Sequence, residues 1–174
     1  MNKAIFLDRD GVLNASVVIN GKPYPPENLE QLEILPGVKG AIDLFKQHGF
    51  LCIIITNQPD VARGKISLSA VEEINKYLLT ALALDDCYCC YHDDKECCEC
   101  RKPKPGSILN AARKYNINLD ESYMVGDRWR DIEAGQNAGC RTIFVDNNYD
   151  EKHPLNPTYT VKTLLETANL IVGN

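Results

Sequence analysis

The sequence has no apolar run long enough to cross a bilayer and no excess of positive charge. A membrane-spanning helix needs about 18 or more consecutive apolar residues, and no stretch of the 174 residues reaches that length. Lysine and arginine together number 19 against 24 aspartates and glutamates, which gives a net charge of −5. The sequence therefore predicts neither a membrane protein nor a general nucleic-acid-binding protein.

The sequence also shows no targeting segment, internal repeat, low-complexity tract or linker. Its first apolar run, Ala4–Leu7, is followed at once by charged residues and is too short for the apolar core of a signal peptide. A chain of this length suits one domain with one buried core. We therefore expect a single domain over residues 1–174, in a cytoplasmic and monomeric protein.

Cysteine is concentrated in one short segment. Six of the eight cysteines lie within residues 87–100, and in a reducing compartment such a cluster indicates a metal site rather than disulfides. Three thiolates and one imidazole make a closed tetrahedral Zn²⁺ site, which is structural because no position stays open for water. Two short pairs supply that set: Cys90 with His92, and Cys98 with Cys100. The spacing leaves three alternative ligands open: Cys87, Cys89 and Cys97.

Short apolar runs alternate with helical patterns along the chain. The runs expected to be buried strands lie at residues 4–7, 50–55, 123–125 and 142–145. The helical patterns lie at residues 37–48, 69–82, 105–115, 132–138 and 161–170. Residues 14–28 and 87–100 are expected to be loops. Such alternation predicts an α/β fold, with a parallel sheet and helices on both faces.

Three of the expected strands end in side chains that can carry chemistry. They end at Asp8, Thr56 and Asp127, and the carboxyl ends of strands are where open α/β sheets bind ligands. Asp8 and Asp10 lie two residues apart, so both can border one small site. One carboxylate can attack phosphorus as a nucleophile, and a second can give and take the proton.

A carboxylate and a phosphate dianion repel each other, so such an attack needs a cation. Mg²⁺ suits the task because it takes oxygen ligands from one or two carboxylates and a phosphate. Asp127 is the best third acid. Asp131 has three possible roles: it can touch the metal shell, brace the loop, or supply a charge that complements a helix dipole. Thr56 and Asn57 can hold phosphoryl oxygens through a hydroxyl and backbone N–H groups, and residues 101–104 supply nearby cations.

These residues form four motifs, in the order that is typical of the haloacid dehalogenase (HAD) superfamily. The motifs are Asp8-Arg9-Asp10-Gly11, Thr56-Asn57-Gln58, Arg101-Lys102-Pro103 and Gly126-Asp127. The chain resembles that superfamily across residues 4–146. The resemblance implies a Rossmann-like fold and a phosphatase activity. The intervals between the motifs leave no room for a separate cap domain, so we expect loops at residues 15–28, 59–66 and 87–100 to cover the site.

The resemblance also implies a role for each matching residue. Asp8 is implied to be the nucleophile and Asp10 the acid and base. Thr56 and Lys102 are implied to stabilise the phosphoryl group, with Lys104 as the rival lysine. The implied Mg²⁺ ligands are Asp8, the backbone carbonyl of Asp10, and Asp127.

The cysteine segment indicates which phosphatases of the superfamily the chain resembles most. Cys-x-His followed by Cys-x-Cys-Arg-Lys-Pro is similar to phosphatases of D-glycero-D-manno-heptose 1,7-bisphosphate, and also to histidinol-phosphate phosphatases. The expected reaction is removal of the heptose C7 phosphate, with histidinol phosphate or another small sugar phosphate as the alternative. The expected substrate contacts are Asn57, Gln58, Arg101 and Arg128. Pro59 departs from the small Ser-Gly pair that these relatives usually carry, which leaves the sugar open.

Two other classes of function also fit parts of the sequence. A zinc-stabilised phosphate-binding module with a decayed site would keep the fold but release no phosphate. A metal-storage or redox protein would use the cysteines chemically. The complete set of acids, threonine and lysine favours the enzyme.

Overall fold

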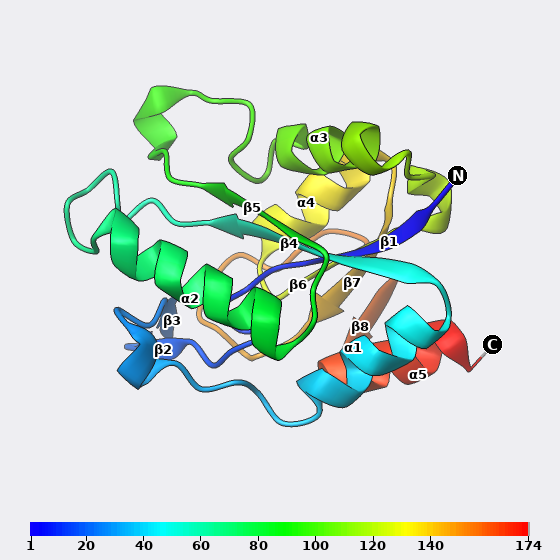
Figure 1. Cartoon of the computed structure of the whole chain (residues 1–174). Helices are drawn as coiled ribbons and strands as arrows, with labels where there is room; N and C mark the ends of the chain where they lie inside the picture. Colours follow the sequence, from blue (N-terminus) through cyan, green and yellow to red (C-terminus); the bar gives the residue numbers. More distant parts are fainter. Residues whose placement is uncertain (174) are drawn as a thin grey trace.

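The computed structural model describes residues 1–173, and one parallel sheet forms its centre (Figure 1). The strand order is β5-β4-β1-β6-β7-β8, and every neighbouring pair runs parallel. The six strands are β1 (Lys3–Leu7), β4 (Phe50–Asn57), β5 (Asp86–Cys90), β6 (Tyr123–Gly126), β7 (Arg141–Val145) and β8 (Tyr159–Val161). The predicted α/β fold with a parallel sheet is confirmed.

Helices cover both faces of the sheet, so β1 is buried on both sides. Ile5 and Leu7 pack into the core of one face, and Ala4 and Phe6 into that of the other. The first face is covered by α1 (Val38–Gln47), α2 (Leu68–Ala81) and α5 (Leu164–Val172). The second is covered by α3 (Gly106–Tyr115) and α4 (Trp129–Ala138). Within residues 1–173 there are also three short 3₁₀ helices: η1 (Leu29–Gln31), η2 (Asp94–Glu96) and η3 (Leu119–Glu121).

The order in which strands are added to the sheet reverses at β1. From β1 the chain adds β4 and then β5 on one side, and afterwards β6, β7 and β8 on the other. The carboxyl end of β1 therefore lies at the point where the strand order reverses, which is the usual ligand crevice of an open α/β sheet. Asp8 follows β1 directly at this position, and its backbone N–H donates to Val125 of the neighbouring β6 at 2.9 Å.

Two expected loops contain strands. Residues 14–28 include a hairpin of β2 (Val17–Ile19) and β3 (Lys22–Tyr24), joined by Asn20 and Gly21, which both have positive φ. Such Asn-Gly pairs favour two-residue hairpin turns. The predicted loop at residues 87–100 is wrong in its first part, because residues 87–90 belong to β5. That strand is an edge strand and only partly buried, so its sequence lacks a long apolar run.

The intervals between the core strands hold only short elements. Between β1 and β4 the chain forms the hairpin, η1 and α1, and between β4 and β5 the only helix is α2. These elements leave no separate cap domain within residues 1–173. Over the same residues, no helix combines the length and apolar character that crossing a membrane requires.

Candidate active site

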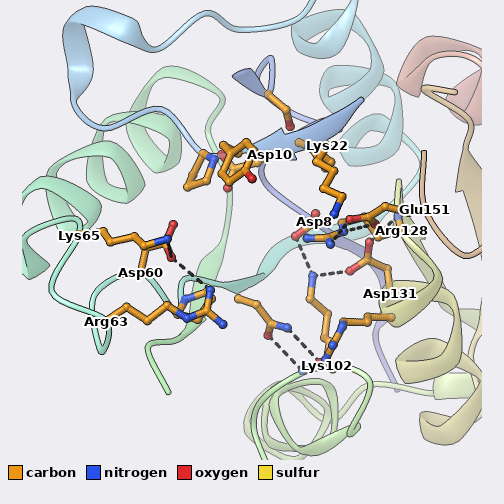
Figure 2. Close-up of a pocket in the computed structure, with 17 residues that line it drawn as sticks. Asp8, Asp10, Lys22, Asp60, Arg63, Lys65, Lys102, Arg128, Asp131 and Glu151 are labelled. Carbon is orange, nitrogen blue, oxygen red and sulfur yellow. Dashed lines mark hydrogen bonds and ion pairs between the residues drawn. The ribbon is translucent and has the colours of Figure 1, made fainter. Parts of the chain in front are cut away.

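The strand ends bring the predicted acids together, and Asp8 and Asp10 line one cavity. Asp8 and Asp10 follow β1, Asn57 ends β4, and all three line a cavity of about 240 Å³. Asp8, Asp127 and Asp131 each offer an oxygen within 4.8 Å of the others. Figure 2 shows the Lys102 ammonium between the carboxylates of Asp8 and Asp131, all three of which line this cavity.

Lys102 is the cation at the centre of this group. Its ammonium donates to Asp8 at 2.7 Å and to the backbone carbonyl of Ile55 at 2.6 Å, and it lies 2.6 Å from Asp131. The side chain is almost fully buried. Burial disfavours its charged form, but the charges of Asp131 and Asp8 together raise its pKa. Lys104, the rival, is instead only partly buried and pairs with Glu99.

Burial, together with repulsion between neighbouring carboxylates, raises the pKa values of Asp8 and Asp127. Burial and the charge of Asp131 raise the pKa of Asp8 to about 6, against the effect of Lys102. Burial, Asp8 and Asp131 raise the pKa of Asp127 well above its usual range. Moreover, Oδ1 of Asp127 is buried without a hydrogen-bond partner within the described residues. A negatively charged site that is lined by carboxylate oxygens, one of them without a hydrogen-bond partner, fits a Mg²⁺ ion.

Gly11 allows the first motif to approach Asp127. Its φ is +88°, and an added Cβ would lie 1.8 Å from Oδ2 of Asp127. Asn147 joins the two segments, since its amide donates to the Gly11 carbonyl at 3.0 Å and to Asp127 Oδ2 at 3.2 Å. Glycine is therefore required here both for backbone conformation and for space.

The Asp10 carboxylate is fixed by a ring of donors. The fully buried Arg9 donates to it from Nε and Nη2, both at 3.1 Å, and reaches Asn75 of α2 at 2.9 Å. Asn14 and Gln58 donate to it at 3.0 and 2.8 Å. The orientation of Asp10 is therefore set by four hydrogen bonds. Sequence reasoning missed the role of Arg9, although its position between two site acids was a signal.

The predicted phosphate and substrate residues occupy different places. Asn57 lines the cavity, and its side chain also holds the backbone of Lys102. The Lys102 N–H donates to Asn57 Oδ1 at 3.1 Å, and Asn57 Nδ2 donates to the Lys102 carbonyl at 3.0 Å. Gln58 is buried and donates to Thr56 as well as to Asp10, so it braces the site from behind. Thr56 is buried beside it at the end of β4.

The two predicted substrate arginines have contrasting surroundings. Arg128 lines the cavity, where Nε donates to Glu151 at 2.8 Å. Within the part of the chain that the structure describes, Arg101 does not line this cavity. Its Nε donates to Asp94 of η2 at 2.8 Å, and its Nη1 donates to the His92 carbonyl at 3.3 Å. The structure therefore shows Arg101 bound to residues of the cysteine loop, and its contact with substrate stays a prediction.

The predicted zinc ligands form a second compact cluster. Ligand atoms of Cys90, His92, Cys98 and Cys100 lie within 4.8 Å of one another. The sulfur–sulfur distances are 3.2 to 3.6 Å, and a tetrahedral zinc site with Zn–S bonds of about 2.3 Å would place its sulfurs about 3.8 Å apart. The donor set and its spacing therefore fit zinc.

The three alternative cysteines lie outside this cluster. Cys87 and Cys89 are on β5, and Cys87 packs against the hydrophobic core. Cys97 is exposed, with its sulfur 3.9 Å from the carbonyl of Asp94. The cysteine loop packs closely against the start of α3 at Gly106. A side chain there would not fit, because an added Cβ would lie 2.2 Å from the carbonyl oxygen of Glu99.

Two acids of the loop at η2 connect the cysteine cluster to the cavity. Asp93 pairs with Arg63 at 2.6 Å, and Asp94 pairs with Arg130 at 3.1 Å. Arg63 and Arg130 both line the cavity. The position of the loop therefore influences two cations that face the site.

Comparison with known proteins places this site in a known class. Residues 99–167 match the HAD-hydrolase-like family model. A Helicobacter pylori protein named D-glycero-beta-D-manno-heptose-1,7-bisphosphate 7-phosphatase is 39% identical over 87% of this chain and 89% of its own length. One of the same name from Pasteurella multocida is 33% identical over 99% and 98%.

A solved structure agrees with these relatives. It is a D,D-heptose 1,7-bisphosphate phosphatase from B. bronchiseptica complexed with magnesium and phosphate, with a TM-score of 0.85, 29% identity and 98% coverage of both chains. The chain therefore belongs to the HAD superfamily of phosphatases. Within that superfamily, it groups with the heptose-1,7-bisphosphate 7-phosphatases.

Proposed function

We propose that this phosphatase removes the C7 phosphate of D-glycero-D-manno-heptose 1,7-bisphosphate through an aspartyl-phosphate intermediate. The observation that carries the proposal is the buried contact of Lys102 with Asp8, 2.7 Å long, inside a cavity that also contains Asp10. The names of the relatives support the substrate. The catalytic unit in this proposal is one domain over residues 1–174.

The chemistry follows from the two acids that the first motif holds in place. An oxygen of Asp8 forms a bond to phosphorus while the bond from phosphorus to the sugar oxygen breaks. Asp10 gives its proton to that departing oxygen. Water then attacks the phosphoaspartate and loses a proton to Asp10, the bond from phosphorus to Asp8 breaks, and inorganic phosphate leaves. Thr56 and Lys102 stabilise the phosphoryl oxygens.

Mg²⁺ fits the carboxylate cluster, with Asp8, the backbone carbonyl of Asp10 and Asp127 as its protein ligands. When bound, the ion supplies the positive charge that reduces repulsion between Asp8 and the phosphate. Asp131 has a different role in this proposal. Its contact with Lys102, 2.6 Å long, holds the ammonium beside Asp8.

Zn²⁺ fits the second cluster, with Cys90, His92, Cys98 and Cys100 as its ligands. All four positions of a tetrahedral ion would be filled by the protein, so its role is structural. By ordering the loop, it would set the positions of Asp93 and Asp94, which hold Arg63 and Arg130 at the cavity.

Histidinol phosphate is the alternative substrate, and its charge differs from that of the bisphosphate. It carries an ammonium and an imidazole, and it lacks the second phosphate of the heptose bisphosphate. The cavity is lined by six lysines and arginines and by five aspartates and glutamates, and Lys22 is the cation without a carboxylate partner in residues 1–173. Cations at a cavity wall favour a second anionic group and disfavour an ammonium.

The test is a substrate panel. Purified enzyme with Mg²⁺ is given both anomers of the heptose bisphosphate, histidinol phosphate and a generic aryl phosphate, and phosphate release is followed. We expect the highest kcat/KM on one heptose anomer. Equal or better kcat/KM on histidinol phosphate would overturn the heptose assignment. No Mg²⁺-dependent release from any member would overturn the enzymatic proposal itself.

A further inference from the structure

One cation in the cavity differs from the rest. Most of the lysines and arginines that line it are engaged by carboxylates. The pairs are Arg63 with Asp93, Lys65 with Asp60, Lys102 with Asp8 and Asp131, Arg128 with Glu151, and Arg130 with Asp94. Lys22 lines the same cavity, and its ammonium makes no hydrogen bond or ion pair with any part of residues 1–173.

The position of Lys22 is set by the β2–β3 hairpin. Lys22 begins β3 and pairs with Ile19 across the two-residue turn. The turn is fixed to the segment after β7, because the Asp150 N–H donates to the Gly21 carbonyl at 3.0 Å. Gly21 has a φ of +75°, and an added Cβ would lie 3.0 Å from Cβ of Asp150.

The segment that holds the hairpin also holds two site residues. Glu151 follows Asp150 directly and pairs with Arg128, and Asn147 contacts Asp127 at 3.2 Å. In Figure 2, the Lys22 side chain points from the hairpin toward the part of the cavity where Asp8, Arg128 and Glu151 gather. The hairpin and this segment therefore form one wall, and Lys22 is the cation that this wall presents without a carboxylate partner.

We propose that Lys22 binds the second, non-reacting phosphate of the substrate and so selects bisphosphates over monophosphates. This inference rests on the proposed function. An arginine already paired with a carboxylate must give up or share that partner to bind a phosphate, whereas Lys22 gives up only water. A lysine ammonium is a compact charge with three donors and a flexible stem, which suits a phosphate.

The test compares matched substrate pairs. The first pair is heptose 1,7-bisphosphate and heptose 7-phosphate, which lose the same phosphate, and the second is fructose 1,6-bisphosphate and fructose 6-phosphate. Wild type, Lys22→Gln, Lys22→Arg and the control Lys65→Gln are assayed on all four. Lys65 lines the same cavity, but Asp60 lies 4.0 Å from its ammonium.

We expect Lys22→Gln to lower kcat/KM on the bisphosphate about tenfold, mainly through KM, since hydrogen bonds to charged groups contribute at least this much. On the matching monophosphate, the loss should stay within about twofold. Lys22→Arg should restore most of the preference, and Lys65→Gln should keep it.

An equal loss on both members of a pair, or no loss on either, would overturn the inference about Lys22. So would a wild-type enzyme that prefers neither bisphosphate over its monophosphate. If wild type hydrolyses the fructose pair but not the heptose pair, the proposed function fails, and the role of Lys22 is then decided by the fructose pair alone.

Discussion

The two clusters of metal-binding side chains are assembled in opposite ways. The carboxylate cluster joins Asp8 to Asp127 and Asp131, residues far apart in the chain that the ends of β1 and β6 bring together. The thiol and imidazole cluster comes from the short range 90–100, and only Cys90 among its members lies in a strand. The first cluster is thus built by the core of the fold, and the second by a loop that depends on its own ligands.

The clusters also differ in burial and charge. All three carboxylates are at least nine-tenths buried, whereas the zinc ligands range from buried to exposed. Like charges in a buried site cost stability, and such sites persist where function requires them. The carboxylate cluster is therefore expected to cost stability and carry activity. The thiol cluster is expected to stabilise its loop and affect activity indirectly.

The strongest test of this contrast is Asp8→Asn. The variant keeps shape and hydrogen-bonding capacity but loses the nucleophile, so we expect kcat to fall by at least about 10³-fold. Phosphate release measures this, and circular dichroism checks the fold. Asp60→Asn is the matched control, because Asp60 lines the same cavity but lies outside the carboxylate cluster and pairs with Arg63 and Lys65. Its kcat/KM should stay within about fivefold of wild type. Retained turnover in Asp8→Asn would contradict the covalent mechanism.

Asp127→Asn separates activity from stability at the same cluster. The ion contributes several kcal/mol to transition-state stabilisation, so we expect turnover to fall about a hundredfold or more. Without Mg²⁺, the variant should melt no lower than wild type, because one of three repelling carboxylates is gone.

Thermal unfolding with and without Mg²⁺ completes that test. At a Mg²⁺ concentration of about 100 Kd, bound ion stabilises the wild type by about 2.7 kcal/mol, which is roughly 5–10 °C for a chain of this size. Asp127→Asn should lose that shift. Asp146→Asn should keep it, because Asp146 pairs with Lys162 outside the cluster. An unchanged shift in Asp127→Asn would show that Asp127 is not a ligand.

The part of the site that follows the core strands could be predicted from the sequence. Asp8 and Asp127 each follow a short apolar run, and parallel strands bring their carboxyl ends to one edge. The central strands of the sheet were predicted for the same reason, since a strand buried on both faces has a continuous apolar sequence. The edge strands β5 and β8 are partly exposed and have no such signal.

Features that depend on long-range side-chain contacts could not be predicted. Arg9 reaches Asn75, 66 positions along the chain, and nothing in the local sequence shows that pairing. Arg101 donates to Asp94, seven positions before it, and the sequence did not indicate that pairing. Lys22 was assigned to a loop, although the Asn20-Gly21 pair before it is a hairpin signal. Motifs thus indicate which residues react, while partners decide which cations are available to bind.

The smallest expected effect comes from the thiol cluster, in a comparison of Cys90→Ser with Cys97→Ser. Cys90 lies within the cluster and Cys97 outside it, facing the carbonyls of η2. We expect metal analysis to find one zinc per chain in wild type and Cys97→Ser, and little in Cys90→Ser. Limited proteolysis should cleave residues 91–101 faster in Cys90→Ser, because the loop loses its cross-link.

The same pair of variants measures how far the loop controls the cavity. Asp93 and Asp94 hold Arg63 and Arg130 only while the loop keeps its position, so Cys90→Ser should lose about tenfold in kcat/KM. That loss is far smaller than for Asp8→Asn, because the acids at β1 and β6 do not depend on the loop. A loss as large as that of Asp8→Asn would show that the loop supports the reacting groups themselves. Zinc loss in Cys97→Ser instead would reassign the ligand set.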